Sequence, residues 1–323
     1  MKSEFEFIEK IRCRSISSKI GDDCAIIPKN SKSDLVITTD LLVEDIDFKL
    51  DWTTPEFLGH KALAVSLSDV AAMGAKPVWA MLSIGVPEKI WKTDFVEKFY
   101  DGWFKLAEKF NVELVGGDVS KTPDKIVIDS ICAGEAKKGK AVLRSGAKAG
   151  DLIFVTGELG GAAAGLKLLE DEIRYDFSKK IWRKRLLLKQ LQPFPQINAS
   201  EFLSKNNLPT AMIDLSDGLS SDLAHLCRES KTGAKIFADK IPIDKNLGGL
   251  TKFLDAKLDF ALNGGEDFEL LFTVNPQKYF KFENEFKNRG FSLIGEVTAN
   301  VEIIELIDGK KTIVLQPKGF RHF

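Results

Sequence analysis

Short β-branched segments alternate with longer helical segments along this chain, and the alternation starts again about halfway. This pattern predicts α/β or α+β layers, in which helices cover sheets. We expect strands at 23–27, 35–39, 112–115, 125–133, 152–156, 211–214 and 270–274. We expect helices at 55–72, 94–110, 162–169 and 218–228. The chain shows no repeat of solenoid length and no low-complexity tract.

A segment rich in lysine and glycine, residues 137–151, separates the two rounds of alternation. The 323 residues are enough for two domains of ordinary size. We therefore predict an N-terminal domain at 1–138 and a C-terminal domain at 139–323.

The helix at 94–110 has one apolar face, because large apolar side chains recur there at intervals of three and four residues. The side chains on this face are Phe95, Phe99, Trp103, Leu106 and Phe110. We interpret them as core residues and not as a ligand-stacking surface. Leu219, Leu223 and Leu226 should likewise point inward from the helix at 218–228.

Charge and composition exclude several classes of protein. The chain has 46 Lys and Arg against 47 Asp and Glu, which argues against a broad nucleic-acid-binding surface. The charged N-terminus does not resemble a signal peptide, and Asp69 and Lys76 interrupt the most apolar region, 63–86. The four cysteines are scattered, so we expect mostly buried, reduced thiols, no zinc site and a cytoplasmic protein.

Six acidic motifs are the strongest indication of chemistry. In each, Asp or Glu stands beside Gly, Ser or Thr; the motifs are 21–23, 38–40, 66–69, 116–118, 214–218 and 264–267. Any one of them could be only a turn or a helix cap. Six in one chain are hard to explain in that way.

Asp69 is the acidic residue that is hardest to explain as a turn, because it lies within an apolar helix. A buried carboxylate without a partner would cost several kcal/mol or would take up a proton. Mg²⁺ would remove this penalty, since it binds carboxylate oxygens and is often shared with substrate phosphates. A salt bridge to Lys61 or Lys76 is the main alternative.

Other motifs give weaker signals. The glycine-rich segment 157–165 lacks the P-loop and dinucleotide patterns, so a packing turn is favoured over a phosphate-binding loop. None of His60, His225 and His322 fits a catalytic triad, and we expect His60 and His225 on helix surfaces. A chain rich in Asp and poor in nucleophiles suits metal-assisted phosphoryl transfer.

Taken together and in order, these segments resemble the thiamine-monophosphate kinase family. The matching segments are 21–25, 38–44, 61–69, 71–75, 116–118, 144–146, 214–219, 264–270 and 318–323, and they span nearly the whole chain. The resemblance implies the two-domain aminoimidazole-ribonucleotide-synthetase-like fold, whose N-terminal strands form a β-barrel with a partner subunit. It also implies a homodimer, several Mg²⁺ ions, and direct in-line transfer of the ATP γ-phosphate to thiamine monophosphate.

The resemblance further implies roles for individual residues and no covalent nucleophile. The implied metal ligands are Asp23, Thr38, Thr39, Asp40, Asp69, Asp118, Asp214 and Asp217, with Asp40 and Asp69 as the key metal holders. The implied ATP-binding residues are Gly117, Asp118, Arg144 and Ser216, and the implied substrate-binding residues are Asp47, Glu266 and Phe320. The family usually has His where this chain has Asp47, which puts the choice of substrate in question.

Other functions stay open from the sequence. An aminoimidazole ribonucleotide or selenophosphate synthetase would share the fold, although Cys13 lacks the glycine-rich context expected of the latter. A non-catalytic nucleotide-binding regulator would show no turnover. A metal-dependent phosphatase or nuclease would usually have His among its ligands.

Overall fold

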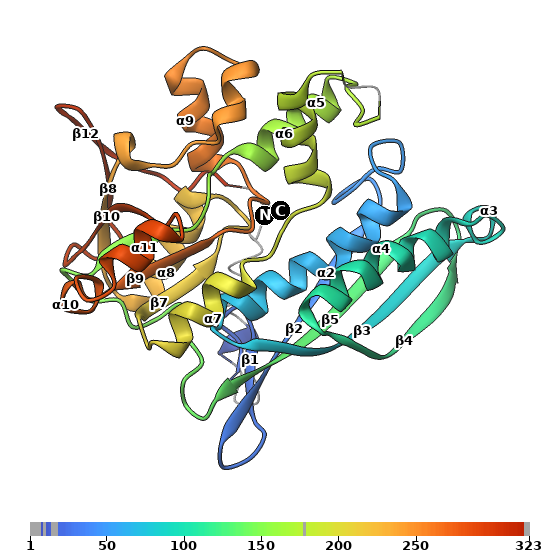
Figure 1. The fold of residues 1–323 in the computed structure, drawn as a ribbon, viewed down its shortest axis with the longest axis horizontal. Coiled ribbons are helices and arrows are strands. Elements are labelled where there is room, and N and C mark those ends of the chain that lie inside the picture. Colours follow the sequence, from blue (N-terminus) through green and yellow to red (C-terminus); the bar gives the residue numbers. More distant parts are fainter. Residues whose placement is uncertain (1–7, 9–10, 14–18, 177–178, 320–323) are drawn as a thin grey trace.

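Two sheets, each covered by helices, make up the fold (Figure 1). The structure is a computed structural model that describes residues 8, 11–13, 19–176 and 179–319. The mixed α/β layers predicted from the sequence are confirmed.

The first sheet has five strands in the order β1-β2-β5-β3-β4. Its strands are β1 (Ala25–Pro28), β2 (Ser33–Val43), β3 (Lys76–Pro87), β4 (Glu113–Thr122) and β5 (Val127–Lys137). Among these strands, only β3 and β4 pair in parallel. In β2 the side chains alternate, so that Val36, Thr38 and Leu42 are buried under the helices while Leu41 is exposed on the other face.

Helices α2 (Pro55–Ala72) and α4 (Phe95–Phe110) cover one face of this sheet, and the short α3 (Glu88–Trp91) precedes α4. Thr54 caps α2 by accepting a hydrogen bond from Phe57 N at 3.3 Å. Two glycines let the helices approach closely. A Cβ on Gly59 would lie 1.8 Å from a backbone oxygen of α4, and one on Gly102 would lie 1.9 Å from Glu56 O.

The close packing of α2 confirms the predicted buried face of α4 but contradicts the predicted surface position of His60. Phe99 and Trp103 of α4 are fully buried, as the spacing predicts. His60, however, is not on a helix surface: it is 7% exposed, and its Nε2 lies 2.7 Å from Pro193 O. The C-terminal domain covers the part of α2 that a helix lying on a single sheet would expose. Among the cysteines, Cys24, Cys132 and Cys227 are buried, as expected.

The strand predicted at 112–115 continues much further than expected. The structure extends β4 through Gly116 and Gly117 to Thr122, because it pairs with β3 along its whole length. Glycine is required at 117, where a Cβ would lie 1.9 Å from Leu82 O. The glycine pair therefore lies in the middle of an exposed edge strand and does not end it.

The second sheet has seven strands in the order β12-β11-β8-β10-β6-β9-β7, and among them only β8 and β11 pair in parallel. Its strands are β6 (Leu152–Val155), β7 (Pro209–Asp214), β8 (Gly233–Phe237), β9 (Leu270–Val274), β10 (Ser292–Thr298), β11 (Ile304–Asp308) and β12 (Lys311–Val314). The described stretch 138–151 between β5 and β6 contains no helix or strand. We predict the domain boundary there, and its position after residue 138 stays a prediction.

Seven α-helices and two 3-10 helices accompany the second sheet within the described residues. They are α5 (Gly161–Glu170), α6 (Ile181–Leu191), α7 (Ile197–Lys205), α8 (Leu219–Ser230), α9 (Leu254–Asn263), α10 (Pro276–Tyr279), α11 (Glu283–Asn288), η1 (Ala238–Lys240) and η2 (Lys245–Gly249). In α8, Leu219, Leu223 and Leu226 are buried, as predicted. No helix in the described part of the chain combines the length and hydropathy needed to cross a bilayer.

The two domains share a continuous core, which fixes the end of α2 against the second sheet. Ser200 of α7 donates a hydrogen bond to Ala71 O at 2.6 Å. Phe154 and Phe272 of the second sheet stack with ring centroids 5.6 Å apart within the same core. The last turn of α2 and the end of β7 are therefore held side by side, and both carry acidic residues.

Candidate active site

Three carboxylates from distant parts of the chain meet where the two domains join. Asp23 precedes β1, Asp69 lies in the last turn of α2, and Asp214 ends β7. One oxygen from each lies within 4.8 Å of the others. Asp23 and Asp214 are buried, and Asp69 is partly exposed. This arrangement brings together three of the predicted metal ligands.

Burial and neighbouring negative charges raise the pKa values of Asp69 and Asp214. Burial, followed by the charge of Asp23, raises the pKa of Asp214 to about 7. Burial, followed by the charges of Asp40 and Asp214, raises the pKa of Asp69 well above its ordinary value. Asp23 Oδ2 is also buried without a hydrogen-bond partner. Crowded, under-satisfied carboxylate oxygens suit a hard divalent cation such as Mg²⁺.

Hydroxyl groups fix the positions of these carboxylates. Thr38 Oγ1 donates to Asp69 Oδ2 at 2.5 Å. Ser68 Oγ donates to Asp214 Oδ2 at 2.6 Å, and Ser66 Oγ donates to Asp40 Oδ2 at 2.6 Å. Both serines belong to α2, so this helix orients acidic groups from both domains.

Asp40 adjoins the cluster, and its own environment is similar. It lies in β2 and accepts its hydrogen bond from Ser66 of α2. Burial raises its pKa to about 6, while the Ser66 hydrogen bond acts in the opposite direction. The charge of Asp40 is the largest electrostatic cause of the raised pKa of Asp69.

The salt bridges considered for Asp69 are wrong. Lys61 Nζ instead contacts Glu266 Oε1 at 2.6 Å, and Lys76 is exposed at the start of β3. Neither lysine therefore pairs with the Asp69 carboxylate, which accepts a hydrogen bond from Thr38.

Arg144, an implied ATP-binding residue, lies beside the cluster. Its guanidinium donates to Asp23 Oδ1 at 2.8 Å, and its backbone N–H donates to Asp22 Oδ1 at 2.8 Å. Its Nε is buried without a hydrogen-bond partner. Arg144 is partly exposed, and a cationic donor next to a carboxylate cluster could bind an anionic ligand oxygen.

Other predicted ligands lie outside this three-carboxylate group. Thr39 faces the opposite side of the sheet from Thr38, and its hydroxyl donates to Asp129 Oδ1 at 2.7 Å. Gly117 and Asp118 are exposed on the edge strand β4. Asp217 lies in the turn between β7 and α8, three residues beyond Asp214. Phe320 lies outside the described residues.

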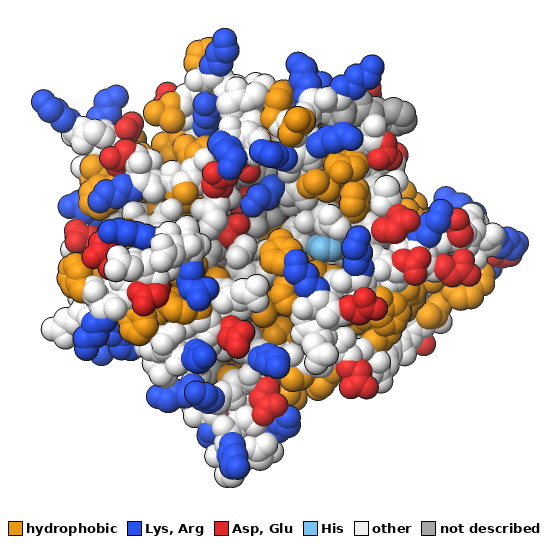
Figure 2. All heavy atoms as spheres, in the orientation of Figure 1, with side chains coloured by type: hydrophobic (Ala, Val, Ile, Leu, Met, Phe, Trp, Pro, Cys, Tyr) orange, Lys and Arg blue, Asp and Glu red, His pale blue; other side chains and the backbone are white. Residues whose placement is uncertain are grey.

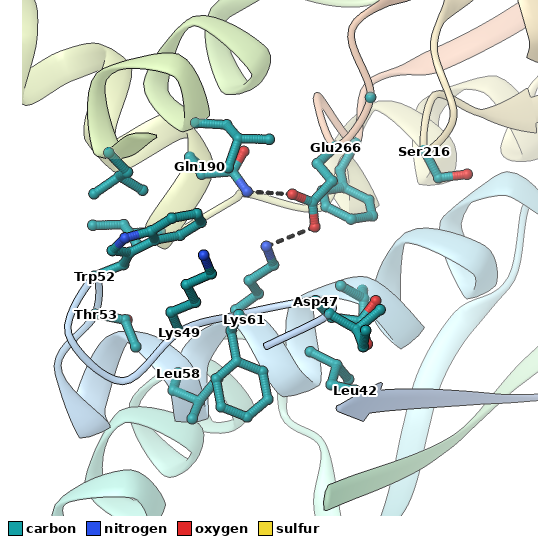
Figure 3. A pocket seen from close by; sticks show the side chains of 18 of the residues that line it. Leu42, Asp47, Lys49, Trp52, Thr53, Leu58, Lys61, Gln190, Ser216 and Glu266 are labelled. Carbon is teal, nitrogen blue, oxygen red and sulfur yellow. Dashed lines mark hydrogen bonds and ion pairs between the residues drawn. The ribbon is translucent and has the colours of Figure 1, made fainter. Parts of the chain in front are cut away.

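A cavity of about 290 Å³ lies between the domains beside this cluster, with Asp40 and Ser216 in its wall (Figure 3). The salt bridge between Lys61 and Glu266 crosses it from α2 to the loop before β9. Gln190 of α6 donates a second hydrogen bond to Glu266. The cavity therefore contains the predicted residue Glu266 in a fixed position.

Asp47, an implied substrate-binding residue, also lines this cavity. One of its oxygens, Oδ2, accepts a hydrogen bond from Val43 N at 2.7 Å, which stabilises the turn after β2. Sequence reasoning does not identify Lys49, Trp52 or Gln190 as cavity residues. They belong to no acidic motif, and only the folded arrangement brings them together.

The segment 265–269 alternates between two cavities. Glu266 and Phe268 line the first cavity, whereas Asp267 and Glu269 line a second one of about 450 Å³. Glu266 and Phe268 have φ values of 64° and 49°, a left-handed conformation that is costly for residues other than glycine.

The glycine-rich turn before α5 is a packing turn. Asp267 accepts hydrogen bonds from Gly160 N at 2.6 Å and Ala162 N at 3.1 Å, so a carboxylate already satisfies this helix N-terminus. A Cβ on Gly157 would lie 2.2 Å from Glu269 Oε1. The structure thus favours the packing interpretation of this segment over a phosphate-binding loop.

The molecular surface agrees with the balanced charge of the sequence. On the face shown in Figure 2, basic and acidic side chains of the described residues are interspersed over both domains. This distribution differs from the basic stripe or patch that is typical of a nucleic-acid-binding surface.

Comparisons with known proteins place these features in context. Residues 21–136 match the N-terminal domain model of AIR synthase related protein, and residues 148–306 match its C-terminal domain model. The chain is 42% identical to a thiamine-monophosphate kinase of Buchnera aphidicola and 35% identical to one of Bacillus subtilis, with 99% of each chain covered in both cases. The solved structure of AaThiL complexed with AMPPCP and TMP is 35% identical with a TM-score of 0.87, covering 99% of this chain and 97% of that one.

Proposed function

The chain belongs to the thiamine-monophosphate kinase family, and on this basis we propose that it transfers the γ-phosphate of ATP to thiamine monophosphate. The products are thiamine diphosphate and ADP. The observation that carries this proposal is the cluster of Asp23, Asp69 and Asp214 at the edge of an interdomain cavity. A solved relative that is similar over nearly its whole length is described as complexed with AMPPCP and TMP.

The proposed metal ligands are those implied by the sequence, with Asp23, Asp69 and Asp214 at the centre. Their oxygen donors, including the unpartnered Asp23 Oδ2, fit Mg²⁺. Bound there, Mg²⁺ supplies positive charge that reduces the repulsion between phosphate groups. The full proposed set is Asp23, Thr38, Thr39, Asp40, Asp69, Asp118, Asp214 and Asp217.

The nucleotide is proposed to bind through Gly117, Asp118, Arg144 and Ser216. Arg144 supports this proposal best, because its guanidinium is close to the carboxylates and its Nε has no hydrogen-bond partner. This Nε–H group is free to donate a hydrogen bond to a phosphate oxygen. Ser216 lies in the cavity wall, where it can contact both co-substrates.

Thiamine monophosphate is proposed to occupy the cavity, with Asp47, Glu266 and Phe320 as contacts. Lys61 and Gln190 hold Glu266 in place, so its carboxylate is oriented before the substrate arrives. The phosphate of the substrate is already ionised at neutral pH. Direct in-line transfer therefore needs no strong general base and no nucleophilic side chain.

We also propose a homodimer that forms through the outer face of the first sheet. Leu41 and Met81 are 61% and 37% exposed there, and β4 is an edge strand. Exposed apolar side chains beside an open edge are typical of an association surface. The buried thiols of Cys24, Cys132 and Cys227 agree with a cytoplasmic location, which is part of the proposal.

Light scattering tests the dimer. Leu41→Glu should convert the dimer to a monomer, because a charge would be placed in an apolar interface. Ile181→Glu, which changes a residue that is 72% exposed at the start of α6, is the matched control and should stay dimeric. A monomeric wild type would contradict the proposal.

The assay for function uses purified protein with ATP, Mg²⁺ and thiamine monophosphate, and separates the products by chromatography. Thiamine diphosphate and ADP should form in equal amounts, and chelation of Mg²⁺ should stop their formation. Turnover of free thiamine or an aminoimidazole precursor, with no thiamine diphosphate formed, would overturn the assignment.

A further inference from the structure

Trp52 forms part of the cavity wall between β2 and α2 and has no role in the site described so far. One part of its indole packs against a leucine cluster of the C-terminal domain that includes Leu169 and Leu191. Trp52 also lines the first cavity, as do both of these leucines. The ring therefore belongs to the packing between the domains and to the binding site at once.

A cation already lies over this ring. Lys49 Nζ is 4.5 Å from the centroid of the Trp52 ring system, within the roughly 6 Å range of cation–π interactions. Lys49 itself lines the cavity, and Figure 3 shows its ammonium beside Trp52. A face of the indole is thus accessible to a positive charge from inside the cavity.

The cavity wall carries acidic groups besides Asp40, which is assigned above to the proposed metal site. These are Asp47 and Glu266, and the ammonium groups of Lys49 and Lys61 lie in the same wall. Lys61 is already paired with Glu266 at 2.6 Å. The other wall residues include Leu42, Phe48 and Leu58, which lower the local dielectric and strengthen electrostatic contacts.

The loop that carries Trp52 is held in place. Arg174 donates to Asp51 Oδ2 at 2.9 Å and to Asp51 O at 2.8 Å, and Trp52 N donates to Lys49 O at 3.0 Å. A ring that is fixed before binding loses little entropy when a ligand stacks on it. These contacts make Trp52 a preformed surface.

We propose that Trp52 is a specificity-determining residue that binds the positively charged thiazolium ring of the substrate through its indole face. This inference rests on the proposed function, since it assumes that thiamine monophosphate enters the first cavity. Trp52 then selects for the charge of the thiazolium ring, while Glu266 lies across the cavity from it (Figure 3). Lys49, on a flexible side chain, yields the ring face to the ligand.

The test compares two ligands by calorimetry without turnover. One is thiamine monophosphate, and the other is its thiophene analogue, which has the same shape but no charge on the ring. The ratio of their affinities measures selection for the cation and cancels any general loss of binding. Trp52→Leu should reduce this ratio by about five- to tenfold, and Trp52→Phe should retain part of it.

Trp182→Leu is the matched control, because Trp182 packs against the same leucine cluster but does not line the first cavity. It should lower stability without changing the ratio. An unchanged ratio in Trp52→Leu, or an equal loss in Trp182→Leu, overturns the inference while leaving the kinase assignment in place. A wild-type protein that binds neither ligand overturns both.

Discussion

Replacing Asp69 by asparagine should make the protein more stable without Mg²⁺ and nearly inactive with it. The amide has almost the same shape as the carboxylate and can still accept the hydrogen bond from Thr38. What changes is the charge. The carboxylate of Asp69 repels those of Asp23 and Asp214, and a neutral amide in its place would not.

The size of the effect follows from the geometry of the cluster. Two unit charges 4.8 Å apart repel by about 3 kcal/mol at an effective dielectric constant of about 20. Asp69 is partly exposed, and Arg144 offsets part of the charge of Asp23. Solvent and this ion pair therefore reduce the stability that the variant gains from removing the repulsion. We expect the free energy of unfolding of the variant to be about 1–2 kcal/mol higher, which raises Tm by a few degrees.

The assay is denaturation in excess EDTA and again in excess Mg²⁺, alongside turnover. Mg²⁺ should stabilise the wild type in proportion to its binding, and should stabilise Asp69→Asn much less. Turnover should fall at least about a hundredfold. Asp308→Asn, at an exposed site on β11, is the control. An equal Mg²⁺-dependent gain in both proteins, or a variant that is less stable in EDTA, would refute the reasoning.

Two further predictions concern the packing of α2. Gly102→Ala should destabilise the protein by about 1–3 kcal/mol despite the better helix propensity of Ala, because its Cβ would lie 1.9 Å from Glu56 O. Gly248→Ala is the control and should be nearly neutral in urea denaturation, because its Cβ would meet only the end of a lysine side chain at 3.9 Å. Burial lowers the pKa of His60 against the opposing effect of its hydrogen bond to Pro193 O, and nearby lysines add to the lowering. The unfolded chain therefore binds this proton more readily, and stability should fall as pH drops below about 6.5. When the free energy of unfolding is measured from neutral pH to about pH 5, it should fall less with acidification in His60→Gln than in the wild type. The same slope in both proteins would contradict the argument.

The parts of the fold that the sequence predicts are those with a strong local pattern. The bounds of α2 and β9 match the prediction, and α4 differs from it by one residue. Strand β3 is absent from the prediction, because Pro77, Gly85 and Pro87 weaken its strand pattern. Its stability comes from pairing with β5 and β4 on both sides, which is a property of the whole sheet.

The candidate site shows the same division between local and distant information. An acidic residue in an apolar helix is a local signal, and it points to Asp69, which the structure places beside Asp23 and Asp214. Strand alternation also places Thr38 and Thr39 on opposite faces, although the resemblance groups them. In contrast, the pairing of Lys61 with Glu266 joins residues from opposite ends of the chain and from different domains, and no local pattern predicts it.

Alternate residues of the segment 265–269 line the two cavities, so this segment forms part of the wall of both. A one-residue insertion or deletion there would exchange which side chains face each cavity. Asp267 and Glu269 are therefore under the same constraint as Glu266, the proposed substrate contact, even though they lie in the wall of the other cavity. Substitutions at Asp267 or Glu269 could thus change the shape of the first cavity, although neither residue lines it.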